Sequence, residues 1–473
     1  MTSNRPHRHR LPRRRPSSNN LDEGFDRRSD FAHTATNYAH VEQRDIAQPA
    51  TPAAHDEPSL RPRRRHELPA RARSRRSRPR AAIVAAAILA VAIVAAGVVV
   101  GIRLGRTHRT VSSPTPAAAP SAGPASPSPT PPGCDTSALL ASMSTRDKLA
   151  QLLMVGVTDA ADARAVVANQ HVGGIFVASW TDLSMLTDGS LAEIAGSAGP
   201  LHLAVSVDEE GGRVERLSSP SLLGKAPSAR FLAQNESPDQ VYQLALDRGR
   251  KMRKLGITID FAPVVDVTDA PDDTVIGDRS FSDKPAVVKQ YAAAYARGLR
   301  DAGVLPVLKH FPGHGHASGD SHATEVVTPP LDEMRDVDLV PYQTLVTQAP
   351  VGVMIGHMQV PGLTGSEPAS LSAAAVTLLR NGKGYGGPPF NGPVFTDDLS
   401  TMRAITDRYG IAEAVLKALQ AGNDTALWVS TTAVPAVLDR LVSALADGEL
   451  SMPNIEASVR RMAAAKAFNS PCG

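Results

Sequence analysis

From Cys134 onwards, the chain alternates two hydrophobic patterns. Short runs of apolar, often β-branched residues predict buried strands, and the longer stretches between them repeat apolar residues with helical spacing. The eight short runs are Leu153–Val157, Gly174–Ala178, Leu201–Asp208, Ile257–Val267, Val304–His310, Val351–His357, Pro393–Asp397 and Thr425–Val429. Eight βα units in one α/β domain predict a closed (β/α)₈ barrel, or TIM barrel. A doubly wound open sheet is the alternative.

The longest apolar run lies ahead of this domain. Residues 81–102 read AAIVAAAILAVAIVAAGVVVGI, which is long enough to cross roughly 30 Å of hydrocarbon as a helix. The arginine-rich stretch before it places residues 1–80 in the cytoplasm by the positive-inside rule. We therefore expect a single-pass signal anchor in the cell membrane, with everything after Ile102 extracytoplasmic. A cleaved signal peptide is the alternative, although both its charged and apolar parts would be unusually long.

Composition separates the remaining segments. Residues 1–80 contain 19 arginines, no lysine and few large apolar side chains, which predicts a disordered cytoplasmic arm. Residues 103–133 are rich in Pro, Ala and Ser and predict an extended linker. Residues 134–473 then form the only globular domain.

Charge is distributed unevenly between these segments. The whole chain carries +3, but 22 of its 50 basic and 9 of its 47 acidic residues precede Cys134. The globular domain therefore has 28 basic and 38 acidic residues, a net charge of −10. The basic arm lacks interleaved aromatic residues and adjoins the apolar run, so membrane orientation explains it better than nucleic-acid binding. We expect no nucleic-acid partner.

The chain has two cysteines, Cys134 and Cys472. An oxidising exterior favours a disulfide between them. Two unpaired thiols are the alternative, because the sequence does not fix the distance between the sulfurs.

Charged and polar residues follow the predicted strands. Asp208 ends the third strand, Lys309 and His310 end the fifth, His357 ends the sixth and Asp397 ends the seventh, while Arg279 lies in the loop after the fourth. A TIM barrel builds its active site from the C-terminal ends of its strands. These residues are therefore candidates for one site.

A histidine-rich segment follows the fifth strand. Residues 309–316 read KHFPGHGH, and Asp320-Ser321-His322 comes shortly after. Zinc needs several converging ligands and no HExxH or CxxC motif is present, so we expect no metal or cofactor. Asp320 can instead hold the Nδ1 proton of His322, whose imidazole can then donate and recover a proton near neutrality. A merely solvated loop histidine is the alternative.

Two further stretches carry candidate chemistry. Residues 392–400, GPVFTDDLS, deliver a carboxylate that can attack an anomeric carbon, as in retaining glycosidases. We assign attack to Asp397 and capping or a supporting hydrogen bond to Asp398. Residues 208–216, DEEGGRVER, place Asp208 and Arg216 where charge-assisted hydrogen bonds can hold sugar hydroxyls. A solvated salt-bridge network is the alternative for this stretch.

Residues 142–465 resemble glycoside hydrolase family 3, specifically its single-domain β-N-acetylglucosaminidases of the NagZ type. The motifs that carry the resemblance are QLLMVGV, GGIFV, DEEGGRVERL, DFAPVVDV, GDRSF, KHFPGHG followed by DSH, and FTDDL. Two departures are Glu209 where Gln is common and Thr396 where Ser is common. Neither removes a catalytic group.

The resemblance implies a role for each candidate residue. Asp397 would be the nucleophile, and His322 with Asp320 the acid/base dyad that replaces the usual carboxylic acid. The residues that would bind N-acetylglucosamine are Asp208, Arg216, Arg279, Lys309 and His310. Asp260 and Asp266 look structural.

These inferences predict an exo-acting, retaining β-N-acetylhexosaminidase that trims peptidoglycan fragments or related glycans outside the membrane. The expected partners are a carbohydrate substrate and the membrane; the oligomeric state stays open. A β-N-acetylglucosaminide phosphorylase is one alternative, because a histidine avoids the repulsion that a glutamate would present to phosphate. A non-catalytic wall-binding barrel is the other.

Overall fold

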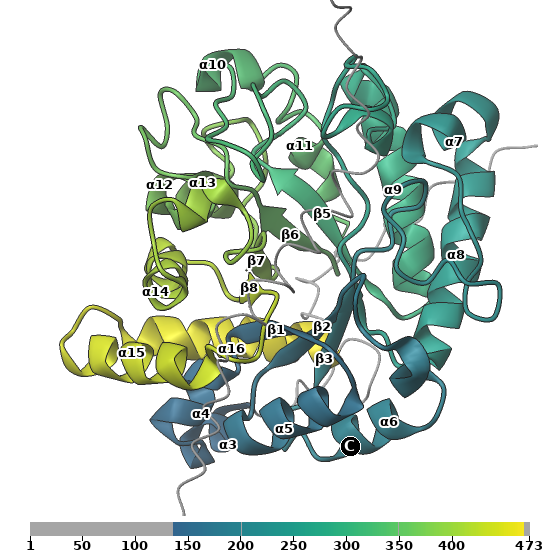
Figure 1. Cartoon of the computed structure of the whole chain (residues 1–473). Coiled ribbons are helices and arrows are strands. Elements are labelled where there is room, and N and C mark those ends of the chain that lie inside the picture. Colours follow the sequence, from purple (N-terminus) through teal and green to yellow (C-terminus); the bar gives the residue numbers. More distant parts are fainter. Residues whose placement is uncertain (1–135, 200, 349, 468–473) are drawn as a thin grey trace, which may run out of the picture. The chain divides into compact units, whose positions relative to one another are not determined.

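The computed structural model describes residues 136–199, 201–348 and 350–467 (Figure 1). The arm, the apolar run and the linker predicted over residues 1–133 lie outside these ranges, and so do Cys134 and Cys472. The signal anchor and the disulfide therefore stay predictions. Among the described helices, none has both the length and the apolar character needed to span a bilayer.

Eight parallel strands form the centre of the domain. They are β1 (Leu153–Val157), β2 (Gly174–Val177), β3 (Ala204–Val207), β4 (Ile259–Asp260), β5 (Leu305–Phe311), β6 (Gly352–Ile355), β7 (Val394–Thr396) and β8 (Ala426–Trp428). From β1 to β7 each strand pairs with the next along the chain, and β1 also pairs with β8. Backbone hydrogen bonds between the segments of β7 and β8 close the ring: Thr396 N donates to Thr425 O (3.0 Å) and Thr425 N to Val394 O (3.1 Å). The predicted barrel is confirmed and the open sheet is excluded.

The prediction placed several strand ends wrongly. The third strand begins at Ala204 rather than Leu201, and the fourth covers Ile259–Asp260 rather than Ile257–Val267. Pro263 follows the short fourth strand and has no N–H to donate, so the regular ladder is interrupted there. Pairing resumes where Val265 N donates to Lys309 O at 2.8 Å.

The barrel interior is packed with large apolar side chains. Phe261 contacts Phe395 edge-on with ring centroids 5.6 Å apart, and Phe176 lies 6.0 Å from Phe261. Met462 of the last helix belongs to the same buried cluster. Strands buried on both faces explain why their sequences are apolar runs rather than alternating patterns.

Helices surround the strands (Figure 1). They are α3 (Thr136–Ser142), α4 (Thr145–Ala150), α5 (Ala160–Gln170), α6 (Ser190–Gly196), α7 (Ala229–Asn235), α8 (Pro238–Lys254), α9 (Pro285–Asp301), α10 (Leu331–Met334), α11 (Tyr342–Leu345), α12 (Ala373–Asn381), α13 (Arg403–Thr406), α14 (Ile411–Ala421), α15 (Val434–Ala446) and α16 (Met452–Ala467). The long helix α8 begins with a capping box in which the Ser237 hydroxyl accepts from Gln240 N and the Gln240 side chain accepts from Ser237 N. Local sequence signals thus set helix starts, while apolar faces attach the helices to the barrel.

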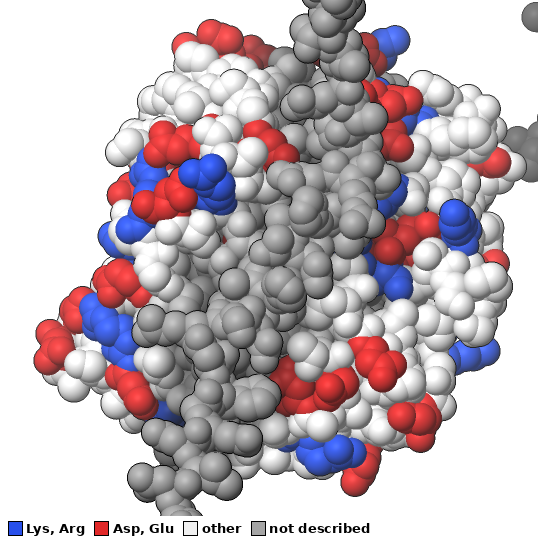
Figure 2. Space-filling view, in the orientation of Figure 1, with Lys and Arg blue, Asp and Glu red and all other residues white. Residues whose placement is uncertain are grey.

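Acidic and basic side chains are interspersed over the described surface on the face shown in Figure 2. Neither sign gathers into one broad patch on the described part of that face. On that face the described residues therefore form no basic patch of the kind that follows a phosphate backbone.

Candidate active site

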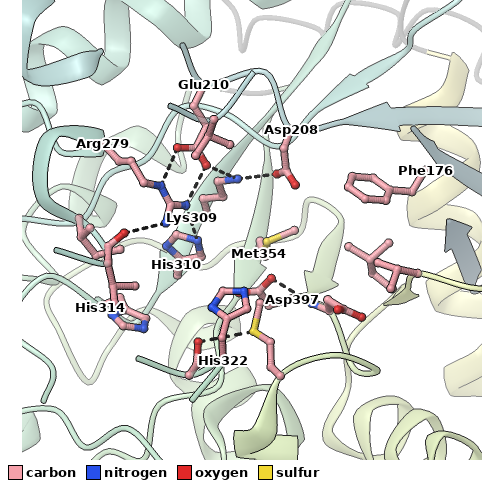
Figure 3. Close-up of a pocket in the computed structure, with 18 of the residues that line it drawn as sticks. Phe176, Asp208, Glu210, Arg279, Lys309, His310, His314, His322, Met354 and Asp397 are labelled. Carbon is pink, nitrogen blue, oxygen red and sulfur yellow. Dashed lines mark hydrogen bonds and ion pairs between the residues drawn. The ribbon is translucent and has the colours of Figure 1, made fainter. Parts of the chain in front are cut away.

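A pocket opens at the C-terminal ends of the strands (Figure 3). Seven of the eight residues predicted to act on substrate line it, and the eighth, Asp320, reaches it through a hydrogen bond to His322. The seven lining residues are Asp208, Arg216, Arg279, Lys309, His310, His322 and Asp397. The structure therefore brings together side chains that the sequence distributes over almost 200 positions.

A buried carboxylate organises the cationic side of the pocket. Glu210 accepts from Arg279 Nε and Nη2, both at 2.8 Å, and its Oε1 lies 2.6 Å from Lys309 Nζ. Lys309 Nζ also donates to Asp208 Oδ1 at 2.6 Å. Figure 3 shows this chain of contacts running from Arg279 through Glu210 and Lys309 to Asp208. The two cations are therefore fixed before any ligand arrives.

The charges in this network stabilise one another. Burial alone would raise the pKa of Glu210, but the positive charges of Arg279 and Lys309 outweigh burial and hold that pKa well below its usual value. Burial alone would lower the pKa of Lys309, but Asp208 and Glu210 raise it instead. Glu210 and Lys309 are thus both ionised at neutral pH.

A second aspartate–histidine pair stands beside this network. His310 Nδ1 lies 2.7 Å from Asp266 Oδ2, and Asp266 Oδ1 accepts from the backbone of His314 at 2.7 Å. His310 Nε2 lies 3.4 Å from Arg279 Nη2. Since a guanidinium can only donate, this contact places the accepting lone pair on Nε2 and the proton on Nδ1. Asp266, which looked merely structural, therefore sets the orientation and tautomer of His310.

The two neighbouring aspartates after β7 have different surroundings. Asp398 is 5% exposed, and its carboxylate accepts from Ser400 N and Oγ (both 2.8 Å), Thr401 N (3.1 Å) and the Thr401 hydroxyl. Asp397 is partly exposed and accepts one hydrogen bond, from Asp398 N at 2.9 Å. Asp398 therefore holds the turn and Asp397 is open to the pocket, while the assignment of attack to Asp397 stays a prediction.

The His357 side chain holds the turn at Asp397 and Asp398 through one of its two hydrogen bonds. His357 Nε2 lies 2.7 Å from the carbonyl oxygen of Asp398, and Nδ1 lies 2.7 Å from Ser370 Oγ. Because a carbonyl oxygen can only accept, Nε2 carries the proton and Nδ1 accepts from the hydroxyl. Burial lowers the pKa of His357 and so favours this neutral form. The contact holds the backbone that carries the Asp397 side chain.

Neighbouring basic side chains keep Asp397 ionised. Burial would raise the pKa of Asp397, but its electrostatic interactions with His310, His357 and Lys309 outweigh burial and lower that pKa. An ionised carboxylate at the pocket wall can act as a nucleophile.

The loop after β5 carries the Asp320–His322 pair. Asp320 Oδ1 accepts from His322 N and lies 2.9 Å from both that nitrogen and His322 Nδ1. The carboxylate fixes the Nδ1 face of the ring, so Nε2 is the nitrogen that can exchange a proton with a ligand. Burial opposes ionisation of Asp320, but its hydrogen bonds from His322 lower its pKa overall. The pair is arranged for acid/base chemistry.

The remaining histidines of this loop have other partners. His316 Nδ1 pairs with Asp338 Oδ1 at 2.9 Å, and burial with the neighbouring His310 lowers the pKa of His314 to about 4. Within residues 136–199, 201–348 and 350–467, no three His, Cys, Asp or Glu side chains are grouped to hold a metal ion. His310, His316 and His322 thus pair with separate aspartates, and His314 packs edge-on against the ring of His310, so the four histidines do not converge on one centre.

Glu209 explains how the loop after β3 presents Arg216. Its carboxylate is fully buried, pairs with Arg248, and accepts from the backbone N–H groups of Arg216 (2.7 Å) and Leu217 (2.9 Å). The substitution of Glu for the usual Gln therefore adds a buried ion pair behind the pocket.

The sequence did not reveal the roles of Glu210, Asp266 and His357. Glu210 lies in the acidic stretch straight after β3, and its position next to a strand end was the available signal. The partners of Asp266 and His357 lie 44 and 41 residues away in sequence, so no local pattern indicated them.

A closed parallel barrel with an open carboxylate, a histidine–aspartate pair and fixed cations at its C-terminal mouth defines a barrel enzyme of the glycosidase class. Residues 144–465 match the glycosyl hydrolase family 3 N-terminal domain, and the chain belongs to this family of glycoside hydrolases. The expected family is thereby confirmed.

Individual relatives agree with this assignment. β-Hexosaminidase LpqI of Mycobacterium tuberculosis is 68% identical over 346 residues, which are 73% of this chain and 89% of the relative. A family 3 glycosyl hydrolase from Mycobacterium smegmatis is 71% identical with a TM-score of 0.68, over 69% of this chain and 98% of that chain. A family 3 β-N-acetylglucosaminidase from a Paenibacillus species is 31% identical with a TM-score of 0.64, over 70% and 64% of the two chains.

Proposed function

We propose that this protein is a retaining exo-β-N-acetylhexosaminidase that removes terminal β-linked N-acetylglucosamine from peptidoglycan fragments through a covalent glycosyl-Asp397. The observation that carries the proposal is the contrast between Asp397, which is ionised and open to the pocket, and Asp398, whose carboxylate is occupied by the turn. Relatives named β-hexosaminidase support the choice of sugar.

In the first step, an Asp397 oxygen attacks the anomeric carbon while the bond to the leaving oxygen breaks. His322, as imidazolium, gives its Nε2 proton to that oxygen, and Asp320 at 2.9 Å stabilises the positive ring beforehand. A histidine in this role explains why the pocket presents one attacking carboxylate instead of the usual pair.

In the second step, neutral His322 takes a proton from water as the water oxygen attacks the anomeric carbon. The bond to Asp397 breaks and the carboxylate is released. Two inversions at the same carbon give a product with retained configuration.

We assign sugar binding to Arg279, Lys309 and Asp208. Lys309 uses two of its three ammonium hydrogens on Asp208 and Glu210, which leaves one donor for a sugar hydroxyl. Asp208 retains its second oxygen as an acceptor. Arg216 and His310 line the same pocket and complete the proposed sugar contacts.

The proposed substrate also implies where the catalytic domain lies in the cell. The apolar run 81–102 and its arginine-rich flank favour a membrane anchor that holds the catalytic domain outside the cytoplasm. An extracytoplasmic position suits wall-derived fragments. Protease accessibility of the domain in intact cells tests it, and a protected domain would contradict it.

The function is tested with aryl β-N-acetylglucosaminide beside aryl β-glucoside, followed by muropeptides carrying terminal N-acetylglucosamine. We expect preferential release from the N-acetyl substrate, and NMR of the first-formed product should show the β-anomer. An initially α-configured product would contradict the covalent intermediate.

A phosphate series separates hydrolysis from phosphorolysis. Turnover independent of phosphate, with free N-acetylglucosamine as product, supports the hydrolase. Accumulation of N-acetylglucosamine 1-phosphate would make the protein a phosphorylase. A folded protein without turnover under either condition would leave only a binding role.

A further inference from the structure

A second cavity lies at the opposite end of the barrel from the catalytic pocket. Its volume is about 220 Å³, and its lining includes Leu203, Thr258 and Gly303, which precede or begin strands β3, β4 and β5. The catalytic pocket lies at the C-terminal ends of the barrel strands. Because all strands are parallel, the two cavities open at opposite ends. This volume accommodates several water-sized groups.

Three nitrogen-bearing side chains reach this cavity from separate elements. Arg253 comes from the last turn of α8, Lys466 from the last turn of α16, and His202 from the exposed segment before β3. The other lining residues are small, apolar, or, like Thr258, hydrogen-bonded to the backbone of Val205. No carboxylate is among the described residues that line it.

Lys466 and Arg253 have no carboxylate partner among the described residues. Lys466 Nζ donates to the neutral Gln151 Oε1 at 3.0 Å, and Arg253 Nη1 makes one long hydrogen bond, 3.4 Å, to Ile257 O. Burial alone lowers the pKa of Lys466 to about 7, and burial alone lowers the pKa of Arg253. Elsewhere in the described domain, buried cations such as Lys309 and Arg248 are paired with carboxylates.

We propose that this cavity is a binding site for a small oxyanion, held between Lys466 and Arg253. An oxyanion supplies the missing negative charge and accepts the hydrogen bonds that both side chains still have to give. Arginine presents a planar fork that suits phosphate or carboxylate oxygens, and lysine adds a point charge. The site is distinct from the catalytic pocket and does not depend on the proposed reaction.

The test measures the thermal unfolding midpoint of the full chain in increasing inorganic phosphate, with sodium chloride at matched ionic strength. Citrate in a parallel series distinguishes a carboxylate from a phosphate source. We expect a saturable rise of about 2–4 °C in phosphate, citrate or both. A response no larger than that in chloride overturns the proposal.

Variants assign the rise to this cavity. Lys466→Met and Arg253→Met should abolish it, whereas Lys466→Arg should retain part of it. Lys254→Met is the matched control, because Lys254 occupies the same turn of α8, is exposed and does not line the cavity. Hydrolytic activity reports that each variant is folded.

Phosphate can also meet the cations of the catalytic pocket, and Arg216→Met controls for this. The rise should persist in Arg216→Met. A rise that is lost in Arg216→Met but kept in Lys466→Met and Arg253→Met would place the anion in the catalytic pocket and overturn the proposal.

Discussion

Glu210 and Arg279 meet in a bidentate pair, with Nε to Oε2 and Nη2 to Oε1 both at 2.8 Å. The two residues are 69 positions apart in sequence and both are largely buried. The pair connects the loop after β3 to the loop after β4 and so fixes one wall of the catalytic pocket. Its stability therefore bears directly on the geometry of the site.

Glu210→Gln should destabilise the wall of the catalytic pocket that Glu210 and Arg279 form. The change removes the charge that compensates both Arg279 and Lys309, and breaking a buried pair typically costs about 3–5 kcal/mol. We expect a lower free energy of unfolding in urea and a raised KM. Glu193→Gln is the matched control, because Glu193 forms an exposed pair with Arg164 and should cost less than about 1 kcal/mol. Equal effects of the two changes would contradict the role of Glu210.

The same variant predicts a pH dependence of stability. The pKa of Glu210 in the folded protein lies below its usual value of 4.5, so folding favours the ionised form. The resulting stability is fully present above pH 4.5 and is lost as the pH falls toward the folded-state pKa. The difference in unfolding free energy between wild type and Glu210→Gln should therefore shrink below pH 4.5. A difference that stays constant with pH would show that charge is not the cause.

Asp397→Ala should abolish turnover while the fold remains. Removal of a nucleophile typically costs on the order of 10⁴-fold or more in kcat. Asp397 accepts only one hydrogen bond in the turn, so the unfolding midpoint should change little. Asp398→Ala should instead lower the unfolding midpoint, because the Asp398 carboxylate holds Ser400 and Thr401 and its loss destabilises the turn. Its turnover should fall less than that of Asp397→Ala. Near-normal kcat in Asp397→Ala would assign the attack to another group.

His322→Ala should affect substrates according to their leaving groups. A natural alkoxide needs protonation, so its cleavage should fall by about 10²–10⁴-fold, whereas a dinitrophenolate leaves without a proton and glycosylation should be nearly unaffected. Asp320→Asn should give a smaller loss in the same direction. Steady-state and burst kinetics with two aryl glycosides measure both steps. An equal loss with every leaving group would indicate a binding role for His322.

Treatment with a chelator should leave activity unchanged. His310, His316 and His322 each direct Nδ1 to an aspartate, and His357 uses both ring nitrogens on protein partners. The described residues also contain no group of three His, Cys, Asp or Glu side chains that could hold a metal ion, so the several ligands that zinc needs do not converge there. Activity that falls with EDTA and returns with one metal would contradict the metal-free mechanism.

The sequence by itself determined the barrel and the residues at its mouth. Apolar runs predict strands because burial on both faces leaves no polar positions, and a charged residue at the end of such a run must lie at the rim. Asp208, Lys309, His310, His357 and Asp397 followed from this local rule. The loops after the strands offered Arg216, Arg279 and the Asp320–His322 pair, and the family resemblance assigned the roles. Strand ends were less well predicted, since Pro263 interrupts the fourth strand inside an apolar run.

Only the tertiary structure decided which partners these residues have. Closure of the barrel brings Asp266 to His310 and His357 to the Asp398 backbone. It also brings Glu210 to Arg279 of the loop after β4 and to Lys309 of β5. It also places Lys466 near Arg253 at the far end of the barrel. Hydrophobic patterning does not predict such contacts, because it specifies which face of an element is buried and not which distant side chain lies against that face.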